Sequence, residues 1–123
     1  MATDPLSTIV EEILVHGADD WVHMPEVHAI VRETVPEADA ATLREQAIAA
    51  ICHVVRLGLM EVGTVTTAGF VGSTETLASF ESRLRAEWSA SPPPFVPGEI
   101  CWLRLTERGA RLADQALERR GSE

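Results

Sequence analysis

The side chains that could do chemistry gather in one short stretch near the N-terminus. The side chains that could ligate a metal ion are His16, Asp19, Asp20, His23 and His28. They straddle an expected helix end and a turn, without the i, i+4 pairing or the closely spaced thiolates of a strong metal site. His23 and His28 are five residues apart, which directs them to different faces of a helix. We therefore expect no bound metal and no other cofactor.

The two cysteines are equally poor candidates for catalysis. Cys52 adjoins His53, but neighbours in a helix project about 100° apart and do not form a nucleophile–base pair. Cys52 falls at the edge of an apolar arc and Cys101 in an expected strand, so both are expected to be reduced core residues. The sequence contains no glycine-rich phosphate loop after a strand and no serine elbow. It therefore predicts a protein that is not an enzyme.

The charge of the chain is unevenly distributed. The net charge is −9, and residues 1–40 hold nine acidic residues against a single base, Arg32. Such an acidic segment repels nucleic acid and anionic membranes, and it attracts a basic partner or keeps a protein in solution. No apolar run reaches the roughly 18 residues of a membrane span, and no basic region precedes an apolar stretch at the N-terminus. We therefore expect a cytoplasmic protein that does not enter the membrane.

Hydrophobic periodicity and capping residues predict the elements that must position these side chains. A helix follows Asp4-Pro5 and stops at Gly17, a short extended piece covers 19–24, and a second helix starts at Pro25. Asp39 caps a third helix from about Ala40 to Leu57. After this helix we expect a strand over 59–66, a glycine-containing loop over 67–72 and a fourth helix capped by Ser73 or Thr74. The chain then continues with a proline-rich loop over 89–98, a strand over 100–105 and a last helix capped by Thr106.

Two stretches resemble the winged helix-turn-helix superfamily. Residues 54–62 resemble the exit of the third helix into the first wing strand, where Gly58 reverses the chain. Residues 102–113 look like the second wing strand and the closing helix, with Gly109 letting the helix approach the sheet. The resemblance, which extends to small bacterial proteins with a helix in the wing, implies one mostly helical α+β domain over 1–123. That domain would be a winged helix-turn-helix with a helical insertion, 67–98, between the two wing strands, and with a frayed tail over 119–123.

The resemblance also implies a function, because winged helices mostly bind double-stranded DNA through the third helix. In this sequence Gln46 could then address adenine, and Arg56 guanine or phosphate. The candidate DNA-contacting residues, with phosphate contacts from the insertion, are Thr42, Arg44, Gln46, His53, Arg56, Arg83 and Arg85. The first hypothesis is therefore a transcriptional-regulator-like DNA-binding protein. The resemblance implies a dimer, because winged-helix proteins often form dimers. The apolar first and last helices also suggest a homodimer.

A second hypothesis is an acidic docking or immunity-type module that binds a protein and not DNA. Specific DNA binding neutralises several phosphates, and the third helix carries few cations. The acidic N-terminal third suits a basic protein partner, and the insertion offers aromatic contacts. The candidate partner-binding residues are Glu11, Glu12, Asp19, Asp20, Trp88 and Phe95. A simpler alternative is that the late arginines pair with neighbouring glutamates and that Trp88 holds the insertion onto the core.

Overall fold

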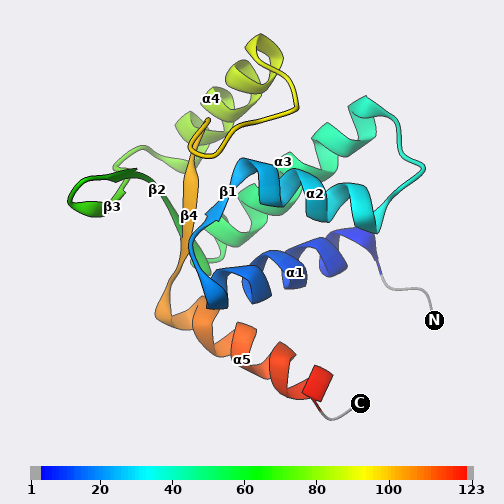
Figure 1. Cartoon of the computed structure of the whole chain (residues 1–123). Coiled ribbons are helices and arrows are strands. Elements are labelled where there is room, and N and C mark those ends of the chain that lie inside the picture. The colour runs from blue at the N-terminus through cyan, green and yellow to red at the C-terminus, as the bar shows by residue number, and fades with distance from the viewer. Residues whose placement is uncertain (1–3, 122–123) are drawn as a thin grey trace.

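The computed structural model describes residues 4–121, which form a mostly helical α+β fold with five helices and four short strands (Figure 1). The elements are α1 (Pro5–Asp19), β1 (Val22–His23), α2 (Met24–Thr34), α3 (Ala40–Arg56), β2 (Met60–Thr66), β3 (Gly69–Gly72), α4 (Leu77–Ala90), β4 (Trp102–Leu105) and α5 (Glu107–Gly121). The predicted order of helices is confirmed. In the described part of the chain, no helix has the length and apolar character needed to cross a bilayer.

Side-chain caps fix where the helices begin. Asp39 accepts a hydrogen bond from the Thr42 amide at 2.8 Å, as predicted for α3. For α4 the predicted caps, Ser73 and Thr74, are wrong, because the Ser73 amide still donates to the Val62 carbonyl at 2.7 Å and so continues the sheet. The cap of α4 is instead Thr76, and the chain turns into the helix only after it.

The four strands form one antiparallel sheet in the order β1-β4-β2-β3. The prediction of a loop over 67–72 is wrong for its second half, because Gly69–Gly72 forms β3 and pairs with β2. The hairpin turns over Thr67 and Ala68, and Gly69 adopts a φ of 104° that favours glycine. The turn lacks the Asn-Gly signature of tight hairpins, which is why the sequence did not reveal it.

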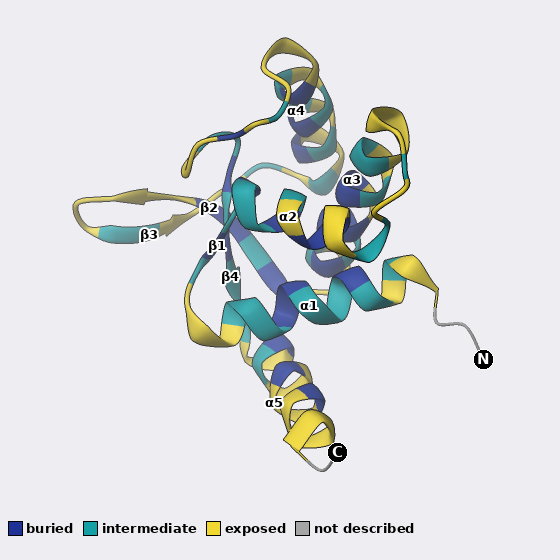
Figure 2. Ribbon diagram, turned by 45° about the vertical axis from the view of Figure 1, so that its right-hand side comes forward, coloured by how far each residue is buried: buried dark blue, intermediate teal, exposed yellow. Residues whose placement is uncertain are grey.

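One contiguous core joins the helices to one face of the sheet (Figure 2). Buried side chains of α1, α2 and α3 meet at its centre, among them Ile13, Val27 and Ile51. The inserted α4 packs along α3 and contributes Phe80 and Leu84, which are fully buried. The insertion is therefore part of the core, and the helix predicted within 67–98 is confirmed.

The last helix, α5, packs along α1 and lies apart from α2, α3 and α4 (Figure 1). The predicted frayed tail is wrong for 119–121, because α5 continues to Gly121. Two arginines near its end contact Glu11 of α1, Arg119 at 2.7 Å and Arg120 at 2.9 Å. These ion pairs hold the last turn in place. Residues 122–123 lie outside the described residues.

Candidate interaction surfaces on helix α3 and the sheet

Four of the residues predicted to contact DNA lie along one exposed strip of α3. Thr42 and Arg56 are exposed, and Gln46 and His53 are partly exposed between them. Their spacings of four, seven and three residues place them on the same side of the helix. The Arg56 guanidinium lies 3.2 Å from Nδ1 of His53, and this is its only hydrogen-bond partner in residues 4–121. The strip is open, but it carries one arginine and the exposed carboxylate of Glu45 beside it.

Arg44 does not belong to this strip. Its Nη2 donates to the Arg85 carbonyl at 3.5 Å and to Ser89 Oγ at 3.3 Å, so the side chain lies against the C-terminal half of α4. The predicted contact of Arg44 with DNA is therefore not supported, since its side chain is turned toward α4. Its carbonyl contact lies where the negative end of the α4 dipole favours a cation.

The two arginines of α4 are both paired with carboxylates. Arg83 contacts Glu75 at 2.8 Å and Glu87 at 2.7 Å, and it also donates to the Ile100 carbonyl at 2.6 Å. The hydrogen bond to Glu75 is the largest cause of the raised pKa of Arg83. The predicted role of Arg83 in phosphate binding is not supported, since its donors point at partners within the chain.

Arg85 bridges two helices. It contacts Glu81 on its own helix and Glu45 on α3, each at 3.1 Å, and the hydrogen bond to Glu45 is the main cause of its raised pKa. The pairing of Arg83 and Arg85 with nearby glutamates, the simpler alternative from the sequence, is confirmed for Glu81 and Glu87. A phosphate approaching either arginine would have to compete with these carboxylates.

Two of the four acids predicted to bind a basic partner are already paired inside the chain. Glu11 and Glu12 contact the arginines at the end of α5, and hydrogen bonds from Arg120 and then Arg119 lower the pKa of Glu11. A basic partner would have to compete with these arginines for Glu11 and Glu12, and their role in partner binding stays a prediction. Asp19 and Asp20, at the end of α1, remain exposed and form no ion pair within residues 4–121.

The two aromatic residues of the insertion, Trp88 and Phe95, are buried and not available as surface contacts. Their rings meet edge to face with centroids 4.9 Å apart, and each ring also packs against His28 of α2. Burial, and then the charge of Arg32, lower the pKa of His28. The alternative role of Trp88, holding the insertion onto the core, is the one observed.

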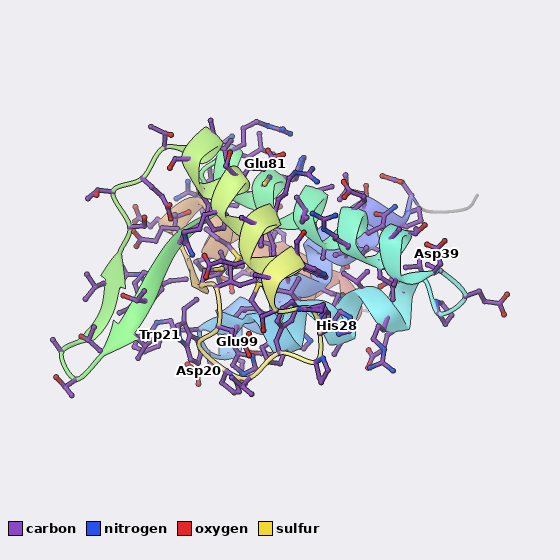
Figure 3. The ribbon with its side chains drawn as sticks, turned by 90° about the horizontal axis from the view of Figure 1, so that it is seen from above. Asp20, Trp21, His28, Asp39, Glu81 and Glu99 are labelled. Carbon is purple, nitrogen blue, oxygen red and sulfur yellow. The ribbon has the colours of Figure 1, made fainter. Side chains whose placement is uncertain are left out.

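An aromatic stack that the sequence did not predict covers the outer face of the sheet. The Phe70 ring lies between Trp21, at 5.7 Å between ring centroids, and the guanidinium of Arg104, at 4.3 Å from the ring centroid. Gly63 makes room for it, since a Cβ there would lie 2.7 Å from the Phe70 ring. Arg104 is also paired with Glu61. Trp21 and the adjoining Asp20 lie near the hairpin in Figure 3.

The hairpin of β2 and β3 ends the sheet with a free edge. No strand of the described chain pairs with the outer side of β3, and the hairpin projects from the body (Figure 2). Because the Ser73 amide bonds to Val62 and antiparallel pairs alternate, the amides and carbonyls of Phe70 and Gly72 face outward. Residues 62–74 contain no charged residue, and Val71 is 48% exposed. The only local signal in the sequence was the β-branched residues on both sides of Thr67-Ala68.

Two of the histidines considered for metal binding are engaged with an acid of α2, and both cysteines are buried. His16 and His23 both contact Glu26, at 3.2 Å and 3.4 Å, and His23 caps α2. Cys52 and Cys101 are buried free thiols, as predicted. Burial raises their pKa values to about 11 and about 12, respectively, so both stay protonated at neutral pH. These groups therefore offer no activated nucleophile.

Comparison with known proteins gives no assignment. No protein-family model, no curated protein and no solved structure is significantly similar to this chain. The function must therefore be argued from the surfaces described above.

Proposed function

We propose that this chain is a protein-interaction module of the winged-helix type, and that it binds an extended segment of a basic partner protein along the free edge of β3. The winged-helix assignment is supported by the order of α1, β1, α2, α3 and β2 and by the sheet order β1-β4-β2. β2 and β4, which pair with each other, then correspond to the two wing strands, and β3 and α4 belong to the insertion between them. Because one fold serves many functions, the proposal rests on the surface.

The observation that carries the proposal is an unprotected strand edge. Proteins usually protect such edges with charged side chains, prolines or a covering element. β3 has no charged residue and no proline. Its outward amides and carbonyls at Phe70 and Gly72 have no strand beside them in the described chain. An extended peptide can satisfy these groups by adding a strand to the sheet. The exposed Val71 and Val65 beside the edge add apolar contact.

Charge indicates what kind of partner would be attracted. The chain has a net charge of −9, and Asp19 and Asp20 are exposed carboxylates without an ion pair in the described residues. They adjoin Trp21, whose ring packs against Phe70 of β3. Complementary charge speeds association and selects partners. A segment with basic residues beside the added strand therefore fits this surface better than an acidic segment.

An array of short peptides, about 10 residues long and therefore enough for one strand, tests the proposal. We expect the protein to retain peptides that combine β-branched residues with a net positive charge. Gly72→Pro removes one outward amide and leaves the β2–β3 hydrogen bonds intact, so it should weaken binding about tenfold. Gly72→Ala replaces the same glycine but keeps its outward amide, and its Cβ would meet only the end of the flexible Glu61 side chain, so it is the matched control. Equal retention by Gly72→Pro, or a preference for acidic peptides, would exclude the edge as the binding site.

DNA binding is a second candidate, because the α3 strip is open. Thr42, Gln46, His53 and Arg56 face away from the core, where a winged helix would place its base-contacting residues. The charge is less favourable, since at least five of the ten arginines contact carboxylates within residues 4–121. The hairpin carries no cation that could meet phosphate. These observations favour a protein partner over DNA.

A further inference from the structure

A cleft of about 470 Å³ lies where the insertion meets the beginning of α3. Its walls include His28, Ala41, Arg44, Trp88, Pro92 and Pro93. In Figure 3, His28 lies near the C-terminal end of α4 and the loop that follows it. Small-molecule sites occupy about 300–1000 Å³, so the cleft is large enough for a small organic ligand.

The only charged side chain in the wall of this cleft is Arg44. Its two hydrogen bonds, at 3.5 Å and 3.3 Å, both come from Nη2 and are long, and its buried Nε has no partner. No carboxylate in residues 4–121 lies within 4.0 Å of its guanidinium, in contrast to Arg83 and Arg85. The buried Nε cannot meet a ligand, so Arg44 is a cation whose unused donors at the side of the cleft are those of Nη1.

The rest of the wall is uncharged and largely apolar. The two prolines provide most of the apolar surface, since Trp88 is only 5% exposed. Burial lowers the pKa of His28, which favours its neutral ring. Three acids adjoin wall residues in the sequence, Asp39, Glu45 and Glu87, and none of them lines the cleft. Asp39 caps α3, Glu45 contacts Arg85 and Glu87 contacts Arg83. The cleft thus combines one cationic end with apolar walls.

We propose that this cleft binds a small monocarboxylate with a planar apolar body, such as an arylacetate. One carboxylate oxygen accepts from Nη1 of Arg44, which has no partner in residues 4–121, and the other replaces Ser89 as an acceptor from Nη2, so that two parallel hydrogen bonds form. The planar body lies against the prolines at 92 and 93 and the small exposed part of Trp88, where it removes apolar surface from water. The site is separate from the edge of β3, so it can be present whether or not the docking proposal is correct.

Isothermal titration calorimetry with phenylacetate as the probe tests this site. Phenylacetamide has nearly the same shape without the charge, so we expect it to bind at least tenfold more weakly. Arg44→Gln should weaken phenylacetate binding about tenfold or more, and Arg44→Lys should restore only part of it. Arg108→Gln removes the same charge from an exposed position on α5 and should bind phenylacetate like the wild type.

Arg44→Gln also removes a contact with α4, so a second variant keeps the test independent of that contact. Ala41 lines the cleft and is exposed, so Ala41→Phe should fill the space and weaken binding while Arg44 remains. Three results would overturn the proposal. They are equal binding of phenylacetate and phenylacetamide, inorganic phosphate binding as tightly as phenylacetate, and no heat from phenylacetate up to about 10 mM.

Discussion

Two glycines allow close packing that no other residue would permit. A Cβ on Gly63 would enter the Phe70 ring, and a Cβ on Gly109 would lie 2.9 Å from the carbonyl carbon of Leu59 and closer still to its oxygen. The role of Gly109 was expected from the resemblance of residues 102–113 to the second wing strand and closing helix of winged helices. The role of Gly63 was not, since its partner Phe70 was expected in a loop.

Substituting Gly109 by alanine should destabilise the fold. The new methyl group would meet backbone atoms, which cannot move aside as a flexible side chain can, so we expect a loss of about 1–3 kcal/mol in the free energy of unfolding. Gly121→Ala in the same helix meets nothing within 4 Å and is the matched control, expected to be neutral or slightly stabilising. Urea denaturation of both variants measures the difference. Equal stability of the two would show that α5 does not approach β2 this closely.

The pairing of charged residues shows what local sequence can and cannot predict. Arg85 with Glu81, and Arg83 with Glu87, are separated by four residues in one helix and could be predicted. The contact of Arg85 with Glu45 joins residues 40 positions apart and depends on how α4 packs on α3. The direction of Arg44 depends on the same packing. For this reason the sequence predicted which arginines are candidates for DNA contact, but it could not predict all of their partners within the chain.

At the scale of elements, the helices followed from periodicity and caps, whereas the edge strand did not. Apolar stripes of α1 and α3 extend over three or more turns, which gives a strong signal. β3 has four residues, two of them glycine, and its pairing depends on β2 rather than on its own composition. The end of α5 was also missed, because the glutamates that hold it are more than 100 positions away in the sequence.

The attachment of α5 to α1 should depend on pH. The pKa of Glu11 is lowered by Arg120 and Arg119, so this contact stabilises the fold above the ordinary carboxyl value of 4.5 and is lost as the pH falls below it. We expect Glu11→Gln to increase amide exchange in the last turn of α5 at neutral pH. The effect on global stability should be small, because exposed ion pairs contribute little.

Asp114→Asn changes an exposed acid of α5 without an ion pair in the described chain, and it serves as the control. Amide exchange followed by mass spectrometry or NMR resolves the last turn from the rest of the helix. If Glu11→Gln and Asp114→Asn exchanged alike, the ion pairs with α1 would not be what holds this turn.

At the scale of the whole molecule, the acidic balance and the pairing of arginines point away from phosphate binding. The sequence predicted the order of helices and the core, but the two functional hypotheses stayed open, because they depend on which arginines remain unpaired. The homodimer remains a prediction. The apolar faces of α1 and α5 pack against each other within one chain, although Leu112 and Leu117 are still 39% and 42% exposed.

The most direct test of whether the protein binds a protein partner rather than DNA is fluorescence anisotropy with a labelled mixed-sequence duplex DNA at about 50 mM salt. We expect no saturable binding at protein concentrations up to about 100 µM, because the α3 strip carries one arginine free of carboxylates and the hairpin carries none. Saturation in the micromolar range, with a steep loss on adding salt and on Arg56→Gln but not on Arg108→Gln, would contradict the account.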